Sequence, residues 1–158
     1  MIKITFSRLA KIPVEDIAAH MSDPALAPHM PLLQGTWDKQ RAVDFVAMKE
    51  ARWAQDGLGH WAILADGVYV GWGGFQLEEE DWDFGLVLKP SAFGLGRRIT
   101  DHAMAFARSN ARIPSVTFLL PPTRTKLGAL ARMGAEFEGE VTLDGALFRK
   151  YRLVTIAP

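Results

Sequence analysis

The 158-residue chain contains no cysteine, which excludes disulfide bonds, cysteine nucleophiles and thiolate metal ligands. No stretch approaches the roughly 18 consecutive apolar residues that a membrane-spanning helix needs. The first ten residues alternate around Lys3 and Arg8 and lack the apolar segment of a secretory signal. His20, His29 and His102 show no ligand spacing. We therefore expect a cytoplasmic protein with no metal and no membrane partner.

The chain also lacks net charge, because 18 Lys and Arg balance 18 Asp and Glu. A nucleic-acid-binding domain is usually strongly basic, so we expect no nucleic acid as a partner. The one uneven stretch is Glu78 to Asp83, which holds five carboxylates in six positions. Two interpretations stay open: a solvated turn, or an acidic lip that attracts a cationic substrate.

The length fits one domain over residues 1–158, with a mixed, mostly antiparallel central sheet and helices on both faces. The order is β-α-α-β-β-β-α-β-α-β-β, an α/β (α+β) class. We expect Thr36 to cap a helix over 36–55 that buries Val43, Phe45, Val46 and Met48. Residues 22–35 are expected to form an irregular loop. The other expected helices are 13–21, 95–109 and 125–133; the expected strands are 2–6, 61–64, 68–76, 82–88, 116–120, 136–143 and 146–154. Exposed hairpin edges permit a homodimer.

The most informative stretch runs from Leu86 to Ile99: an apolar strand, a Pro-led turn, Gly94-Leu-Gly96 and a helix start. A helix N-terminus offers unpaired amides and a partial positive charge. Glycines let a phosphate approach those amides, and Arg97 and Arg98 add charge. The segment is suited to a pyrophosphate. It is no dinucleotide fingerprint, because Ile99 stands where the third glycine would be, and a simple packing turn is the alternative.

The segment Pro90-Ser-Ala-Phe-Gly-Leu-Gly96 resembles the acyl-CoA-binding motif of the GNAT acetyltransferases. Together with WAILADGVYVGWGGF, WDFGLVLKP and LGALARMGAEFEGE, it is similar to the branch that holds ribosomal-protein N-terminal, spermidine and aminoglycoside acetyltransferases. The resemblance covers about residues 37–153. It implies a splayed strand pair in the sheet and an acetyl-CoA-dependent N-acetyltransferase. The acceptor would be a small-molecule amine or a peptide N-terminus, attacking directly in a ternary complex. A non-catalytic acyl-CoA sensor or scaffold is the alternative.

The resemblance also implies a cofactor site. A pantetheine arm would pair with the strand before the motif, as an added strand does, and the amides of residues 94–98 would hold the pyrophosphate. The alternative for Leu86 and Leu88 on this strand is that their side chains simply pack in the core. The implied cofactor-binding residues are Leu86, Val87, Leu88, Phe93, Gly94, Leu95, Gly96, Arg97 and Arg98.

Asp83 matches the acidic position of the branch's Glu-x-Gly pattern and is the candidate general base, with a solvated surface carboxylate as the alternative. Thr125 stands in for a serine of the branch as a second catalytic candidate, with helix capping as its alternative. The expected substrate-side residues are Trp72, Asp81 and His60. Many family members carry a tyrosine acid in the late helix. That position is Leu130 here, so no phenol is expected to protonate the departing thiolate.

Overall fold

A computed structural model describes residues 1–30, 35–125 and 127–155. Its strands are β1 (Ile4–Ser7), β2 (His60–Ala65), β3 (Val68–Glu78), β4 (Asp81–Leu88), β5 (Ser115–Leu120), β6 (Glu136–Leu143) and β7 (Ala146–Val154). The α-helices are α1 (Val14–Met21), α2 (Lys39–Asp56), α3 (Gly96–Arg108) and α4 (Gly128–Met133). Short 3₁₀ helices are η1 (Leu9–Lys11), η2 (Pro24–His29) and η3 (Pro90–Leu95). The order of the β-strands and α-helices agrees with the order expected from the sequence.

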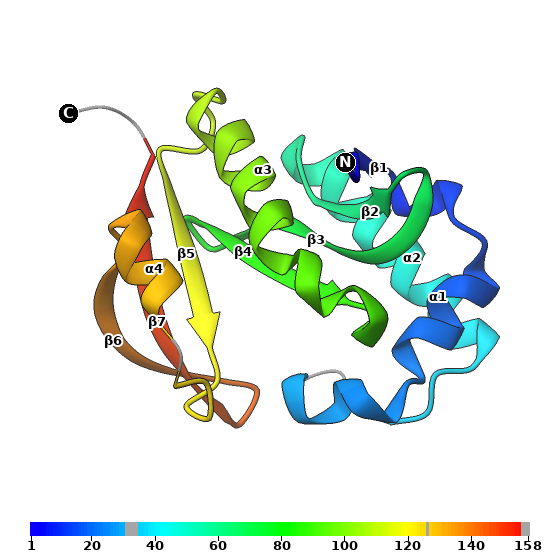
Figure 1. Cartoon of the computed structure of the whole chain (residues 1–158). Coiled ribbons are helices and arrows are strands. Elements are labelled where there is room, and N and C mark those ends of the chain that lie inside the picture. The colour runs from blue at the N-terminus through cyan, green and yellow to red at the C-terminus, as the bar shows by residue number, and fades with distance from the viewer. Residues whose placement is uncertain (31–34, 126, 156–158) are drawn as a thin grey trace.

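The strands form one sheet in the order β1-β2-β3-β4-β5-β7-β6, and every neighbouring pair is antiparallel except β4–β5. Helices α1 and α2 cover one face, and α3 and α4 cover the other (Figure 1). The expected mixed, mostly antiparallel sheet between helical layers is confirmed. Among the described residues, no helix is both long and apolar enough to cross a membrane.

Each helical layer buries its own part of the core. On the α1–α2 side, Phe45 packs edge-on against Trp37 and Trp72. On the α3–α4 side, Phe75 is fully buried beside Trp61 and Phe106. Burying one large apolar side chain contributes about 1.5–3 kcal/mol. Both faces of strands β2 to β4 are therefore fixed, which sets the direction of every side chain on them.

The buried face of α2 differs from the expected one. Val43 and Met48 are 39% and 52% exposed, so both assignments are wrong; Phe45 and Val46 are buried as expected. The remaining buried positions are Ala42 and Lys49, which complete the i, i+3, i+4, i+7 spacing of one helical face. Apolar residues lie on both sides of this helix, and the sequence therefore did not reveal that a lysine belongs to the core-facing stripe.

Two expected helix caps are also wrong. The Asp38 carboxylate, not Thr36, accepts a hydrogen bond from the Arg41 amide at 2.8 Å and starts α2. Helix α4 begins at Gly128 after Leu127, with no side-chain cap, so Thr125 lies outside it. Proline-rich 121–125 forms a turn before the helix, closed by Arg124 N–H to the Pro121 carbonyl. In the expected loop 22–35, η2 gives residues 24–29 a helical turn, while 31–34 lie outside the described residues.

Glycines in β3 permit close backbone approach to β4. A β-carbon on Gly71 would lie 2.4 Å from the Val87 carbonyl oxygen, and one on Gly73 would lie 2.3 Å from that of Gly85. Such separations exclude any other residue unless the backbone moves. The register between β2 and β3 also shifts at Ile63/Leu64, which is a β-bulge or similar irregularity next to Gly71.

Candidate active site

The sheet is interrupted where β4 meets β5. The two parallel strands pair only at Trp82↔Val116 and Asp83↔Thr117, and then diverge (Figure 1). No further pairing between them exists in the described part of the chain, so the β4 segment from Phe84 to Leu88 has one edge without a neighbouring strand. The expected splayed strand pair is confirmed. We refer to the space beside residues 84–88 as the slot.

Alternation along β4 determines which backbone groups face the slot. The Lys89 amide bonds to Val70 on β3, and the Val87 and Gly85 carbonyls approach β3 glycines. Successive residues of a strand point their backbone N–H and C=O groups in opposite directions. The backbone groups of Phe84, Leu86 and Leu88 therefore point to the slot. Val87 directs its backbone to β3. An extended ligand can therefore pair with alternate residues of β4 only.

The apolar side chains of β4 serve the core as well. Leu88 is buried beside Ile99 and Ala92, and Leu86 packs against the same cluster. Val87 packs on the opposite face, toward α2. The core-packing interpretation is thus correct for these three side chains. Any ligand contact that they make in the slot would come from backbone groups of Leu86 and Leu88.

The motif after β4 forms a 3₁₀ turn, η3, that runs directly into α3. Gly96 is helical, with φ −55° and ψ −43°, and Gly94 has no left-handed φ. A β-carbon on Gly94 would meet nothing within 4 Å, and one on Gly96 would meet only Leu88 Cδ1 at 3.8 Å. Neither the backbone nor the packing therefore requires glycine here. The two glycines keep open space at the N-terminus of α3, where unpaired amides attract anions.

The two arginines of this turn lie differently. Arg98 Nη2 donates to the Ile2 carbonyl at 2.5 Å, which anchors the Arg98 guanidinium to the segment before β1. Arg97 is exposed on the first turn of α3. Leu95 packs against the cluster around Ile99, and Phe93 is 47% exposed.

Asp83 is half-buried on the α2-facing side of β4, next to the start of the slot. The Thr117 hydroxyl on β5 donates to its carboxylate at 2.9 Å. Burial raises the pKa of Asp83 to about 7; Glu78 and Asp81 add to the rise, and the Thr117 bond and Lys150 oppose it. A carboxyl group with a pKa near neutrality suits proton transfer.

The acidic run does not form a free acidic lip. Asp81 accepts from Lys150 Nζ at 2.8 Å and from Arg152 Nη2 at 3.0 Å, and these bonds hold its pKa below the usual value against the opposing effect of burial. Glu78 accepts from Arg52 at 3.2 Å. Glu79 and Glu80 form the exposed β3–β4 turn. The solvated-turn interpretation therefore fits the tip, and ion pairing accounts for Glu78 and Asp81.

A buried polar chain that the sequence did not reveal lies beside Asp83 on the same face. Lys49 Nζ on α2 is 2.9 Å from His60 Nδ1 and 3.0 Å from Gln76 Oε1. Gln76 is directly opposite Asp83 in the β3–β4 register and donates to Glu78 at 2.7 Å. The only signals in the sequence were the helical spacing that puts Lys49 beside Phe45 and Val46, and the strand alternation of Gln76.

Of the remaining candidates, Trp72 borders this group: its ring centroid lies 5.5 Å from that of His60 and 5.0 Å from Lys49 Nζ. Trp72 is 4% exposed and packs in the α1–α2 core, where its Nε1 donates to Met21 Sδ at 3.2 Å. Thr125 is exposed in the turn before α4. Leu130 is buried in the core beneath α3 and α4 and carries no acid. Asp83, Thr117, Gln76, Lys49 and His60 are the polar residues that the fold brings together.

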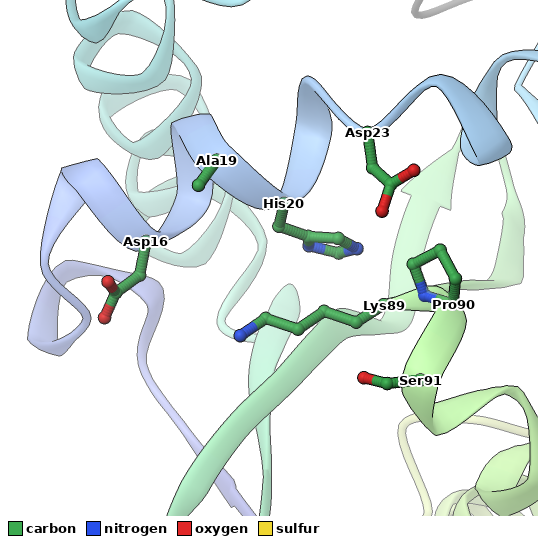
Figure 2. Close-up of a pocket in the computed structure, with 7 residues that line it drawn as sticks. All are labelled: Asp16, Ala19, His20, Asp23, Lys89, Pro90 and Ser91. Carbon is green, nitrogen blue, oxygen red and sulfur yellow. The ribbon is translucent and has the colours of Figure 1, made fainter.

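Two pockets lie near α1, away from Asp83. One, of about 260 Å³, is shown in Figure 2: His20 on α1 faces Lys89, Pro90 and Ser91, with Asp16 and Asp23 to either side. His20 bonds through Nδ1 to the Tyr69 hydroxyl at 2.8 Å, while its Nε2 is buried without a bond. Burial lowers the pKa of His20 to about 4, so the ring is neutral.

The second pocket, of about 450 Å³, is lined by residues that follow α1 and precede α2: Met21, Ser22, Asp23, Pro24, Ala27, Met30, Gly35, Thr36 and Trp37. Neither pocket includes Trp72 or Asp83. No group of three or more His, Asp or Glu side chains among the described residues could hold a metal ion.

No protein-family model and no curated protein matches this sequence. Solved structures match the fold along nearly the whole chain. A protein from Bordetella pertussis assigned to the GnaT acetyltransferase family superimposes with a TM-score of 0.76 and 15% identity, over 96% of this chain and 95% of that one. RimL, a ribosomal L7/L12 alpha-N-protein acetyltransferase in complex with coenzyme A, gives a TM-score of 0.71 and 16% identity, over 97% and 93%. Aminoglycoside acetyltransferase AAC(6')-Ib, also in complex with coenzyme A, gives a TM-score of 0.70 and 11% identity. The match covers 98% of this chain and 95% of that one.

At these identities the similarity establishes the fold and not the activity. The chain has the fold of the GNAT acetyltransferases, as the resemblance implied.

Proposed function

We propose that this chain is an acetyl-CoA-dependent N-acetyltransferase that acts on a primary amine of a small molecule or a peptide N-terminus. The observation that carries the proposal is the open turn at Gly94 and Gly96, which continues directly from the slot beside β4. No fold requirement explains either glycine. Space for an anion at a helix N-terminus does explain them.

The residues present fit coenzyme A in two places. The N–H and C=O groups of Phe84, Leu86 and Leu88 point to the slot and can pair with the two amides of a pantetheine arm. The amides of residues 94–98 and the exposed Arg97 can bind a pyrophosphate at the start of α3. The strand leads straight into this turn, as a continuous ligand would require.

The thioester of bound acetyl-CoA supplies an activated acetyl group. Asp83 accepts the proton that the acceptor ammonium must lose, directly or through a water molecule. A slot-facing amide of β4, from Phe84 or Leu86, binds the carbonyl oxygen as it gains negative charge. Since Leu130 offers no acid, the departing thiolate is protonated from solvent. The acceptor attacks directly, because the chain has no cysteine to carry an acyl group.

The first test is calorimetric titration of the purified protein with acetyl-CoA, followed by thiol-release assays over a panel of amines. We expect micromolar binding and turnover on at least one amine. Binding without turnover on any amine would favour the second candidate, an acyl-CoA sensor, to which the buried Leu130 lends support. Absence of binding would contradict both candidates.

The two arginines of the α3 turn give a paired prediction. Arg97→Ala removes an exposed cation near the proposed pyrophosphate, so we expect acetyl-CoA affinity to fall about 3- to 10-fold, with a weaker dependence on salt. Arg98→Ala breaks the bond to the Ile2 carbonyl, so we expect a lower melting temperature with near-parental affinity. Calorimetry at two salt concentrations measures the acetyl-CoA affinity of each variant, and thermal melts measure its melting temperature. Equal affinity losses for the two variants would contradict the distinction.

A further inference from the structure

His60 reaches from β2 to β4 across the α2-facing side of the sheet. In the strand registers His60 pairs with Gly74, and Gly74 pairs with Gly85. Gly85 has no side chain to block the ring. A β-carbon there would lie 3.8 Å from His60 Nε2 and 3.8 Å from Cε1. The Nε2 edge of the imidazole is therefore directed at the β4 position next to the slot, two residues from Asp83.

Lys49 determines which nitrogen of His60 carries the proton. An ammonium group has donors only, so the 2.9 Å contact from Lys49 Nζ makes Nδ1 the acceptor and leaves the proton on Nε2. Burial lowers the pKa of Lys49 to about 8, so the amine is still charged at pH 7. Burial, Lys49 and Arg52 lower the pKa of His60, so its ring is neutral. His60 therefore presents a neutral N–H donor toward Gly85.

The charges on this face argue against a polyamine. Strands β3 and β4 place the carboxylates of Glu78, Asp81 and Asp83 on this face. Glu78 is paired with Arg52, and Asp81 with Lys150 and Arg152. Within the part of the chain that the structure describes, only Asp83 among these three lacks a basic partner. A polycation needs several free carboxylates, whereas of these three carboxylates on β3 and β4 only that of Asp83 has no ion pair with a described residue, and His60 offers an N–H donor beside it.

We propose that the Lys49–His60 pair selects acceptor amines that carry a carbonyl or carboxylate oxygen on the neighbouring carbon, as in a peptide N-terminus or an α-amino acid amide. The inference rests on the proposed function. Asp83 and Gly85 are two positions apart on one strand face, about 7 Å. An amine hydrogen-bonded to Asp83 and an oxygen hydrogen-bonded to His60 Nε2 span this distance with two bonds of about 3 Å.

In the reaction His60 donates a hydrogen bond and transfers no proton. The acceptor ammonium first loses one proton through Asp83 to solvent. The nitrogen lone pair then forms the C–N bond at the thioester carbonyl carbon, and the C–S bond breaks with its electron pair left on sulfur. The second nitrogen proton is released, and the thiolate takes up one proton. His60 thus fixes the position of the amine, and Lys49 acts through His60 as a positioning residue.

The experiment compares glycinamide with propylamine, which matches its length but lacks the oxygen. Wild-type protein, His60→Leu and His60→Gln are assayed with saturating acetyl-CoA. Because the two amines ionise differently, the quantity compared is the ratio of variant to wild-type kcat/KM for each amine. We expect His60→Leu to lower the glycinamide value at least 10-fold more than the propylamine value, mainly through KM. His60→Gln keeps an N–H donor and is expected to restore part of this discrimination.

Lys49→Met tests the positioning role. The side chain stays unbranched, is one atom shorter and loses its donors, so we expect the same selective loss for glycinamide. Nitrogen-15 NMR of the His60 ring is expected to show the proton fixed on Nε2 in the wild type and spread over both nitrogens in Lys49→Met. Met48→Ala, at an exposed neighbouring position on α2, is the matched control and is expected to keep the wild-type ratio of the two amines.

Two results would overturn the inference: equal losses for both amines in His60→Leu, or a wild-type protein that prefers propylamine or spermidine to glycinamide. Acetyl-CoA binding without turnover on any amine is a different failure. It would reject the proposed function itself, and the selectivity with it. Acetyl-CoA titration of each variant separates the two cases.

Discussion

Replacement of Asp83 by asparagine is expected to lower kcat about 100- to 1000-fold at pH 8, with little change in acetyl-CoA affinity. The variant keeps an oxygen that can accept the Thr117 hydroxyl bond, so the local geometry is preserved. It removes the group that takes the ammonium proton. Steady-state thiol release gives kcat, and calorimetry gives the dissociation constant. Near-parental turnover would remove Asp83 from the mechanism.

The pH profile gives an independent readout of the same residue. With the pKa of Asp83 near 7, the fraction of ionised base rises from pH 6 to pH 8, so kcat is expected to rise with pH and to level off above neutrality. Thr117→Val removes a bond that lowers this pKa, so the inflection should move to higher pH. Asp83→Asn should abolish it. An inflection that persists in Asp83→Asn belongs to another group.

The same substitution is expected to stabilise the protein at high pH. The folded pKa of Asp83, about 7, lies above its unfolded value of 3.8, so between these values the folded state binds the extra proton. Stability contributed by the neutral carboxyl group is therefore present at low pH and lost as pH rises through 7. Asp83→Asn should gain on the order of 2 kcal/mol at pH 8 and little at pH 4. Denaturant unfolding at both pH values checks this.

Sequence patterns determined most of the fold because local signals agreed with tertiary packing. The Asp66-Gly67 and Asp144-Gly145 turns adopt positive φ at both residues, as the hairpins require. Gly57 and Gly134 end α2 and α4 in the left-handed conformation. The motif 90–96 also lies at the expected junction of strand and helix. In each case a residue with special backbone freedom coincides with the end of a periodic run.

The active-site network was less predictable, because its members have ordinary surface types. Lys49 and Gln76 are polar residues at positions that only the packing of α2 on the sheet makes internal. Asp83 was found through its motif, but its partner Thr117 depends on the β4–β5 register, which no local pattern fixes. The anchoring of Arg98 was not predictable for a similar reason, since its hydrogen bond joins it to the Ile2 carbonyl, 96 positions away in the sequence.

The second large effect is expected for Gly96→Asp, which should reduce acetyl-CoA affinity at least 100-fold while the protein stays folded. A β-carbon at this position meets only Leu88 Cδ1 at 3.8 Å, and the backbone is helical, so the substitution introduces no strain. An acidic residue is also favourable in the first turn of a helix. The carboxylate would, however, occupy the space proposed for the pyrophosphate and repel it. Calorimetric titration and thermal melts measure the two quantities.

Two control variants separate this effect from general changes in the helix. Gly96→Ala adds only the β-carbon and should stabilise α3 by about 0.5–1 kcal/mol. An intermediate affinity for this variant would mean that phosphate packs directly against the glycine. Gly128→Asp introduces the same residue at the first position of α4, so an affinity loss confined to Gly96→Asp would assign the effect to the turn before α3. Should Gly96→Asp retain full affinity, Gly94 and Gly96 would be a packing turn. Because no close contact and no left-handed φ requires glycine at either position, we expect the loss.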